Sequence, residues 1–233
     1  MKRIFFVSYF FIFFTVSGLA IQSDEQEKNL PLIVVNPKFD NRNAPVAIII
    51  SGDGGWYKFE QGIADSLAGF GLPSIGLDTR KYFRNRRTPE ETASDLAKSI
   101  NHYNSIWHRS SYIFIGYSLG AELVPFIVNK LQDSIKLKVS MLVLLSPAST
   151  TDFQVHYSDM IGIDNKHDTY KVVDEINKIR TIPVLFIFGV EEKSQVPAML
   201  TGPRVLIATV PGDHRYNRDA SIIVKTMKDH RVF

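Results

Sequence analysis

The 233-residue chain contains no cysteine, so neither a disulfide bond nor a cysteine nucleophile contributes to its fold or chemistry. Internal repeats and low-complexity tracts are also missing outside its first residues. Its 27 basic and 24 acidic residues nearly balance, which argues against nucleic-acid binding through a strongly positive surface. A domain without disulfides must be held together by its hydrophobic core, and 45% hydrophobic residues are enough to build one.

Residues 1–20 have the composition of a cleavable export signal. Lys2 and Arg3 supply a positive start, residues 4–16 are apolar and rich in phenylalanine, and small residues lead up to Ala20. We expect cleavage after Ala20, although the same segment would also serve as an uncleaved anchor. The lack of cysteine at the junction excludes a lipoprotein signal. Export without disulfides favours a bacterial periplasm.

A candidate nucleophile stands in the segment Gly116-Tyr117-Ser118-Leu119-Gly120, which matches the pattern G-x-S-x-G. An apolar β-branched run precedes the motif and a helical pattern follows it, as in the nucleophile elbow of serine hydrolases. Glycines without a Cβ let strand and helix approach closely, while Ser118 takes a strained backbone conformation. The alternative is a glycine-rich turn in which Ser118 has no chemical role.

A base and an acid follow Ser118 in the order that such enzymes use. Two further apolar runs, at 183–189 and 205–210, read as buried strands, and each is followed by a titratable group. His214 is the candidate base, because the other five histidines do not follow a buried strand and are interpreted as surface residues. Glu192 is the preferred acid, with Glu191 as a competitor. Either glutamate could instead be a solvated loop residue.

A glycine-rich loop after an early strand is the candidate oxyanion hole. The apolar run at 46–50 ends in Ser-Gly-Asp-Gly-Gly-Trp at 51–56, where three glycines let backbone N–H groups face a cavity. We expect one donor from Asp53 or Gly54 and the other from Leu119. The alternative is a flexible turn, which Trp56 argues against because an aromatic ring there usually packs.

Repeated alternation of strand and helix patterns predicts an α/β fold, with a mostly parallel sheet and helices on both faces. Residues 21–233 are interpreted as one domain, with a loose lead-in at 21–29 and a small cap or insertion at 148–180. Residues 153–157 alternate and are interpreted as an inserted strand of that cap. Strands are expected at 31–35, 46–50, 73–77, 113–115, 139–145, 183–189 and 205–210, and helices at 59–70, from 89, after 118 and at 217–228.

Four segments, at 51–56, 78–83, 87–90 and 116–122, resemble the VirJ family of bacterial virulence proteins and the similar C-terminal domain of AcvB. The resemblance covers nearly the whole chain after residue 20. It implies an α/β-hydrolase-like fold, a periplasmic location, and hydrolysis of aminoacylated phosphatidylglycerol, notably the lysyl form, with links to virulence and type IV secretion. It supports Ser118 and His214. The chain departs from the family pattern at Leu119, where Phe is commoner, and after His214, where Arg215, Tyr216 and Asn217 follow.

Charged side chains near these motifs are candidates for binding such a substrate. Asp53 and Glu122 could pair with a substrate ammonium group, although a turn cap and a helix-surface ion pair are the simpler interpretations. A basic cluster after residue 78 could bind a phosphodiester or an anionic membrane surface, or could simply be solvated. The cluster consists of Arg80, Lys81, Arg84, Arg86 and Arg87.

The sequence thus predicts a periplasmic serine hydrolase that cleaves an aminoacyl ester with Ser118, His214 and Glu192. No metal and no cofactor is expected. The expected partners are an aminoacylated anionic phospholipid, the membrane surface and secretion-system proteins, but no nucleic acid. Two alternatives stay open: a non-catalytic periplasmic accessory protein of secretion, and an esterase or lipase of other specificity.

Overall fold

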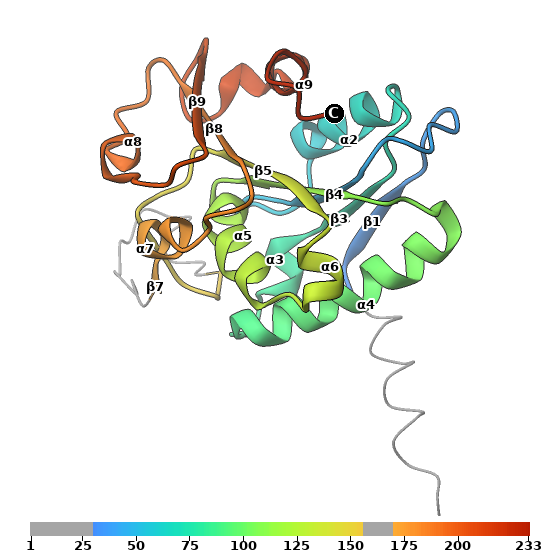
Figure 1. Ribbon diagram of the computed structural model, residues 1–233. Helices are drawn as coiled ribbons and strands as arrows, with labels where there is room; N and C mark the ends of the chain where they lie inside the picture. The colour runs from blue at the N-terminus through green and yellow to red at the C-terminus, as the bar shows by residue number, and fades with distance from the viewer. Residues whose placement is uncertain (1–29, 156–169) are drawn as a thin grey trace, which may run out of the picture.

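The computed structural model describes residues 30–155 and 170–233, and the predicted signal and lead-in lie outside these ranges (Figure 1). The described part contains a seven-stranded sheet with the order β1-β3-β2-β4-β5-β8-β9. Neighbouring strands are parallel except β1, which runs antiparallel to β3. The strands are β1 (Leu32–Val35), β2 (Val46–Ile50), β3 (Ser74–Leu77), β4 (Tyr112–Tyr117), β5 (Val139–Leu145), β8 (Val184–Gly189) and β9 (Val205–Val210).

Helices cover both faces of the sheet, as expected from the alternating pattern (Figure 1). The core on one face includes apolar side chains of α2 (Lys58–Ala68) and α9 (Ala220–Asp229). The core on the other face includes side chains of α4 (Pro89–Trp107), α5 (Leu119–Lys130) and α7 (Val172–Asn177). Three short α-helices, α3 (Thr79–Tyr82), α6 (Asp133–Lys136) and α8 (Val196–Met199), and the 3-10 helix η2 (Tyr216–Arg218) complete the described part.

Strand β2 illustrates why the central strands read as continuous apolar runs. Its five residues are all buried. Val46, Ile48 and Ile50 pack into one core, whereas Ala47 and Ile49 pack into the other. Successive side chains of a strand point to opposite faces, so a strand covered by helices on both sides needs apolar residues at every position.

The strand order reverses at β2, and this reversal determines where a site can form. The chain passes from β2 through α2 to β3 on one side, and then returns through α4 to β4 on the other side of β2. Ligand sites in open parallel sheets lie beyond the carboxyl ends of the strands at such a reversal. The loop after β2, which is the candidate oxyanion hole, and the turn after β4, which carries Ser118, therefore lie next to each other.

The helix expected from residue 89 begins there, at the start of α4. The Thr88 Oγ1 accepts the N–H of Glu91 at 3.1 Å, and the Glu91 carboxylate accepts the N–H of Thr88 at 2.8 Å, which is a capping box with Pro89 at the first helical position. The predicted helix at 217–228 begins later, at Ala220, because Asp219 caps it. Asn217 and Arg218 before it have positive φ values of 51° and 58°.

The predicted inserted strand at 153–157 is wrong where the structure describes it, because residues 153–155 are not in a strand. Phe153 is fully buried and packs edge-on against Phe83 and Phe126, so the apolar alternation reflects core packing. The strands of this region are instead the two-residue pair β6 (Thr150–Thr151) and β7 (Tyr170–Lys171). Residues 156 and 157 lie outside the described ranges.

Within residues 30–155 and 170–233, none of the helices combines the length and the apolar character that crossing a membrane requires.

Candidate active site

The turn between β4 and α5 has the geometry of a nucleophile elbow. Ser118 stands at its apex with φ 51° and ψ −118°, a conformation that non-glycine residues rarely adopt. A Cβ added at Gly120 would lie 2.1 Å from the carbonyl oxygen of Ile50, and one at Gly116 would lie 2.4 Å from that of Gly120. The predicted close approach is therefore confirmed, since any larger residue would push α5 away from β2 and β4.

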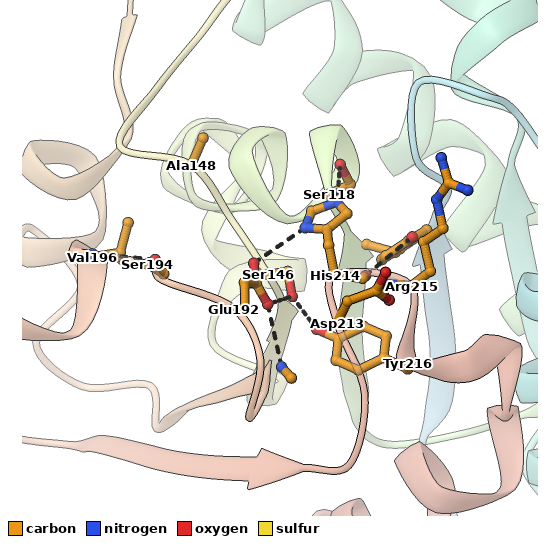
Figure 2. A network of polar contacts seen from close by, with 12 residues as sticks. Ser118, Ser146, Ala148, Glu192, Ser194, Val196, Asp213, His214, Arg215 and Tyr216 are labelled. Carbon is orange, nitrogen blue, oxygen red and sulfur yellow. Dashed lines mark hydrogen bonds and ion pairs between the residues drawn. The ribbon is translucent and has the colours of Figure 1, made fainter.

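Three polar side chains from three strand ends meet above this turn (Figure 2). The Nε2 of His214 lies 3.0 Å from the Ser118 Oγ, and its Nδ1 lies 3.1 Å from the Glu192 Oε1. Because an ionised carboxylate can only accept, Nδ1 carries the proton and Nε2 is free to accept the hydroxyl proton. The arrangement can therefore pass a proton from Ser118 to His214 while Glu192 holds the ring.

The structure separates the two glutamates that the sequence left as alternatives. Glu192 is half-buried and faces His214, whereas Glu191 is exposed and its N–H donates to the Gly212 carbonyl at 3.1 Å. Among the other histidines, His102 and His108 are exposed and His230 is half-buried at the end of α9. The remaining two, at 156 and 167, lie outside the described residues.

The pKa shifts of His214 and Glu192 are those expected of a catalytic base that is hydrogen-bonded to its acid. The hydrogen bond to Glu192 is the main cause that raises the pKa of His214, and partial burial opposes it. Burial pushes the pKa of Glu192 upward, but hydrogen bonds from His214, Ser146 and the Gly189 N–H outweigh it and lower that pKa below the ordinary value. Glu192 is therefore ionised wherever His214 titrates.

Buried groups hold the glycine-rich loop at 51–56 in place. The Glu60 carboxylate accepts the N–H of Tyr57 at 3.1 Å and that of Gly52 at 3.5 Å. Burial raises the pKa of Glu60, and these backbone bonds oppose that shift. The Trp56 ring covers Gly76, where an added Cβ would lie 2.2 Å from it, and its Nε1 donates to Gln61. The loop is packed as expected from Trp56.

Two segments beside Ser118 carry the expected oxyanion donors: the first turn of α5 and the glycine-rich loop, where a Cβ added at Gly52 would lie 3.6 Å from that of Ser118. The N–H of Leu119 belongs to the first turn of α5, where backbone N–H groups have no acceptor within the helix. The N–H of Gly54 donates to the side chain of Asp53 at 2.8 Å, so it is engaged within the loop. Of the two expected loop donors, the structure favours the N–H of Asp53 because that of Gly54 already has an acceptor.

A comparison with known protein families finds a match that covers most of this chain. Residues 44–231 match the family described as bacterial virulence protein (VirJ). The chain belongs to the VirJ family. A comparison with curated proteins yields no match.

Solved structures with the same architecture are α/β-hydrolases. Est1E from Butyrivibrio proteoclasticus superposes with a TM-score of 0.61 at 15% identity, over 86% of this chain and 92% of its own. A lipase-esterase related protein from Clostridium acetobutylicum has a TM-score of 0.58 at 17% identity, over 85% and 99%. MenH from S. aureus has a TM-score of 0.59 at 10% identity, over 86% and 98%. These similarities show that this VirJ-family protein has the α/β-hydrolase fold.

Two carboxylates flank the nucleophile in this VirJ-family protein. Glu122 lies one turn along α5, half-buried, and its Oε1 accepts the N–H of Ala148 at 3.2 Å. Burial raises its pKa, and the charge of Asp53 adds to that shift while His214 opposes it. Asp53 is exposed at the loop tip. Among the described residues, no group of three or more histidine, aspartate or glutamate side chains could hold a metal ion.

The five members of the predicted basic cluster have different surroundings in the structure. Arg80 lies beside the glycine-rich loop, where its Nη1 donates to the Tyr57 hydroxyl at 3.1 Å. Arg84 is exposed, whereas Arg87 stacks over the Tyr82 ring at 5.0 Å. Two other members form ion pairs, Lys81 with Asp78 and Arg86 with Asp152. Arg80 is therefore the member of the basic cluster that lies directly beside the glycine-rich loop.

Sequence reasoning missed two residues behind Glu192. Ser146 contacts the Glu192 Oε2, the carboxylate oxygen that His214 does not contact, Tyr216 contacts Ser146, and both residues are buried (Figure 2). Neither belongs to a motif. The available signals were indirect: Ser146 ends a buried strand before a proline, and Tyr216 stands where the chain departs from the family pattern.

Proposed function

We propose that this protein is a serine ester hydrolase, with Ser118 as nucleophile, His214 as base and Glu192 as the acid that orients His214. The observation that carries the proposal is the continuous hydrogen-bonded chain from the Ser118 Oγ through His214 to Glu192. The strained backbone at Ser118 and the free N–H of the first turn of α5 support the same chemistry.

In the first half-reaction, the Ser118 Oγ attacks the ester carbonyl carbon and its proton passes to the His214 Nε2. The N–H groups of Leu119 and Asp53 stabilise the negative charge that develops on the carbonyl oxygen. The ester bond to the alcohol then breaks, and His214 returns its proton to the leaving oxygen. In the second half-reaction, His214 takes a proton from a water molecule, which attacks the carbonyl carbon of the acyl-enzyme. The bond to the Ser118 Oγ breaks, His214 returns the proton to that oxygen, and the free acid is released.

The substrate that we propose is an aminoacyl ester, most specifically lysyl-phosphatidylglycerol. Glu122 and Asp53 supply negative charge beside the nucleophile, which suits a protonated amino group on the acyl part. Arg80 beside the glycine-rich loop suits the phosphodiester of the leaving alcohol. Membership in a family described as bacterial virulence proteins agrees with this substrate class, which the family resemblance implies.

We further propose a periplasmic location, contact with the membrane surface and a link to secretion-system proteins. The composition of residues 1–20 supports export. A lipid substrate held in a bilayer requires that the site open toward the membrane surface.

Hydrolysis of purified lysyl-phosphatidylglycerol by the chain without residues 1–20 tests the proposal. The wild type is compared with Ser118→Ala and with Ser94→Ala, a control that removes an exposed hydroxyl from α4. We expect lysine release by the wild type and the control only.

The outcomes separate the alternatives. Cleavage of a short-chain ester without lysine release would keep the hydrolase and exclude the lipid substrate. Turnover of neither substrate would favour the non-catalytic accessory protein, and equal turnover by Ser118→Ala would exclude Ser118 as nucleophile.

A further inference from the structure

A second layer of polar groups holds the acid of the candidate triad. Ser146 follows β5 with a φ of 49°, and its Oγ lies 2.5 Å from the Glu192 Oε2. The same Oγ contacts the hydroxyl of Tyr216, which is fully buried in the turn after His214 (Figure 2). The Gly189 N–H also donates to the Oε2 at 3.2 Å.

The two carboxylate oxygens of Glu192 therefore have separate tasks. The Oε2 accepts from Ser146 and Gly189, while the Oε1 accepts from His214. A glutamate side chain has three rotatable bonds, and loss of the Oε2 contacts would let the carboxylate turn away from the imidazole. The layer behind Glu192 thus determines where the Oε1 lies.

The number of available protons determines which group donates in each contact of this layer. Three contacts join Tyr216, Ser146, Glu192 and the Ile187 carbonyl, but the two hydroxyls hold only two protons. Since ionised Glu192 cannot donate, Ser146 must donate to it. The Ile187 carbonyl can only accept and lies 2.7 Å from the Tyr216 oxygen, so Tyr216 donates its proton to Ile187, which also accepts the N–H of Ser146 at 3.0 Å. The consistent assignment is therefore Ser146 to Glu192 and Tyr216 to Ile187, which leaves the Ser146–Tyr216 contact as one in which the fixed tyrosine oxygen packs against the serine hydroxyl.

We infer that Ser146 and Tyr216 are positioning residues: Ser146 holds the Glu192 carboxylate against His214 by donating to it, and Tyr216, fixed on the Ile187 carbonyl, holds the Ser146 hydroxyl in place. The inference rests on the proposed function for its catalytic consequence, but its geometric content concerns the Glu192–His214 contact alone. Tyr216 acts through Ser146, because no hydrogen bond in the described part of the chain joins it to Glu192 directly.

The variants that test this are Ser146→Gly, Tyr216→Phe and the double variant. Glycine removes the hydroxyl and also suits the positive φ, and phenylalanine keeps the ring that stacks on Phe59. Tyr112→Phe is the control, since it removes a buried tyrosine hydroxyl at the other end of β4.

We expect kcat on a short-chain ester to fall about tenfold in Ser146→Gly and less in Tyr216→Phe, with KM nearly unchanged. The double variant should match Ser146→Gly, because Tyr216 has nothing to act through once Ser146 is gone. The acid limb of kcat/KM should move to lower pH, since a loosely held Glu192 raises the pKa of His214 less. Additive losses, or unchanged pH profiles, would overturn the inference.

Titration of the His214 imidazole by NMR separates this inference from the proposed function, because it needs no turnover. A lower His214 pKa in Ser146→Gly than in the wild type supports the positioning role even if no ester is cleaved. Equal His214 pKa values in folded wild type and Ser146→Gly would reject the positioning role even if the wild type is an efficient esterase. Thermal unfolding of each variant verifies that the native fold is retained.

Discussion

The two halves of the candidate site are built in different ways. The nucleophile half is one continuous segment, from Gly116 to Ala121, and backbone contacts shape it. The acid–base half joins residues that are far apart in the chain: His214 follows Ser118 by 96 positions, and Glu192 follows Ser146 by 46.

This difference decides how each half can fail. The elbow depends on two absent Cβ atoms and on local sterics, so a single methyl group is enough to disturb it. The acid–base half depends on side-chain hydrogen bonds that the packed ends of β5, β8 and β9 bring together, so loss of one donor weakens it by degrees. The following variants break each half separately.

The largest effect is expected for the reacting pair itself. Ser118→Ala and His214→Ala should each lower kcat/KM for an ester by at least about a thousandfold, because each removes a participant in proton transfer. The double variant should lose little more, since the two residues act as a unit. Steady-state kinetics beside Ser94→Ala measure this, and near-normal turnover by either single variant would show that the assignment is wrong.

Substitution of the acid, Glu192, should lower activity less than substitution of Ser118 or His214. Glu192→Gln should lower kcat by roughly a hundredfold, while Glu191→Gln, an exposed neighbour, should stay within about twofold. Neutral His214 accepts the proton and Glu192 raises its pKa, so the wild-type acid limb should lie above about 6.5. That limb should move down toward about 6.5 in Glu192→Gln and should stay in place in Glu191→Gln. A larger loss of kcat in Glu191→Gln than in Glu192→Gln would show that Glu191 is the acid of the triad.

Gly120→Ala tests the local half without touching a reactive group. Its Cβ would lie 2.1 Å from the Ile50 carbonyl oxygen, so α5 must shift, and we expect a loss of about 2–3 kcal/mol in the free energy of unfolding. Gly54→Ala is the control, because its nearest contact would be an ordinary 3.7 Å to the Tyr57 ring. Denaturant unfolding of both measures the difference, and equal stability would show that the elbow tolerates a side chain.

The smallest effect concerns substrate selection. Glu122→Gln keeps the acceptor for the Ala148 N–H and removes the charge, so KM for a lysyl ester should rise roughly tenfold. A neutral short-chain ester serves as the matched substrate and should show no change. Since burial raises the pKa of Glu122, the wild-type KM for the lysyl ester should itself rise as the pH falls through that value. Equal effects on both esters would exclude ammonium recognition by Glu122.

Local signals were good predictors of the elements in this chain. The apolar runs at β2, β5, β8 and β9 act within a few residues, so the positions of these strands were predicted correctly, but β9 is a largely exposed edge strand and not the buried strand expected at 205–210. The alternation at 153–157 misled because Phe153 is buried by tertiary contacts with Phe83 and Phe126 rather than by strand pairing. The helix after His214 begins at Ala220 and not at residue 217, because Asp219 caps it.

By itself, the sequence determined the elbow at Ser118, the glycine-rich loop after β2 and the α/β alternation, because each depends on residues close together in the chain. Only the tertiary structure decided between Glu191 and Glu192, since both follow β8 and only packing against the turn after β9 turns one of them toward His214. It also brought Ser146 and Tyr216 behind the acid. No local pattern encodes a contact between three strand ends, because hydrogen bonds across such distances exist only once the sheet has formed.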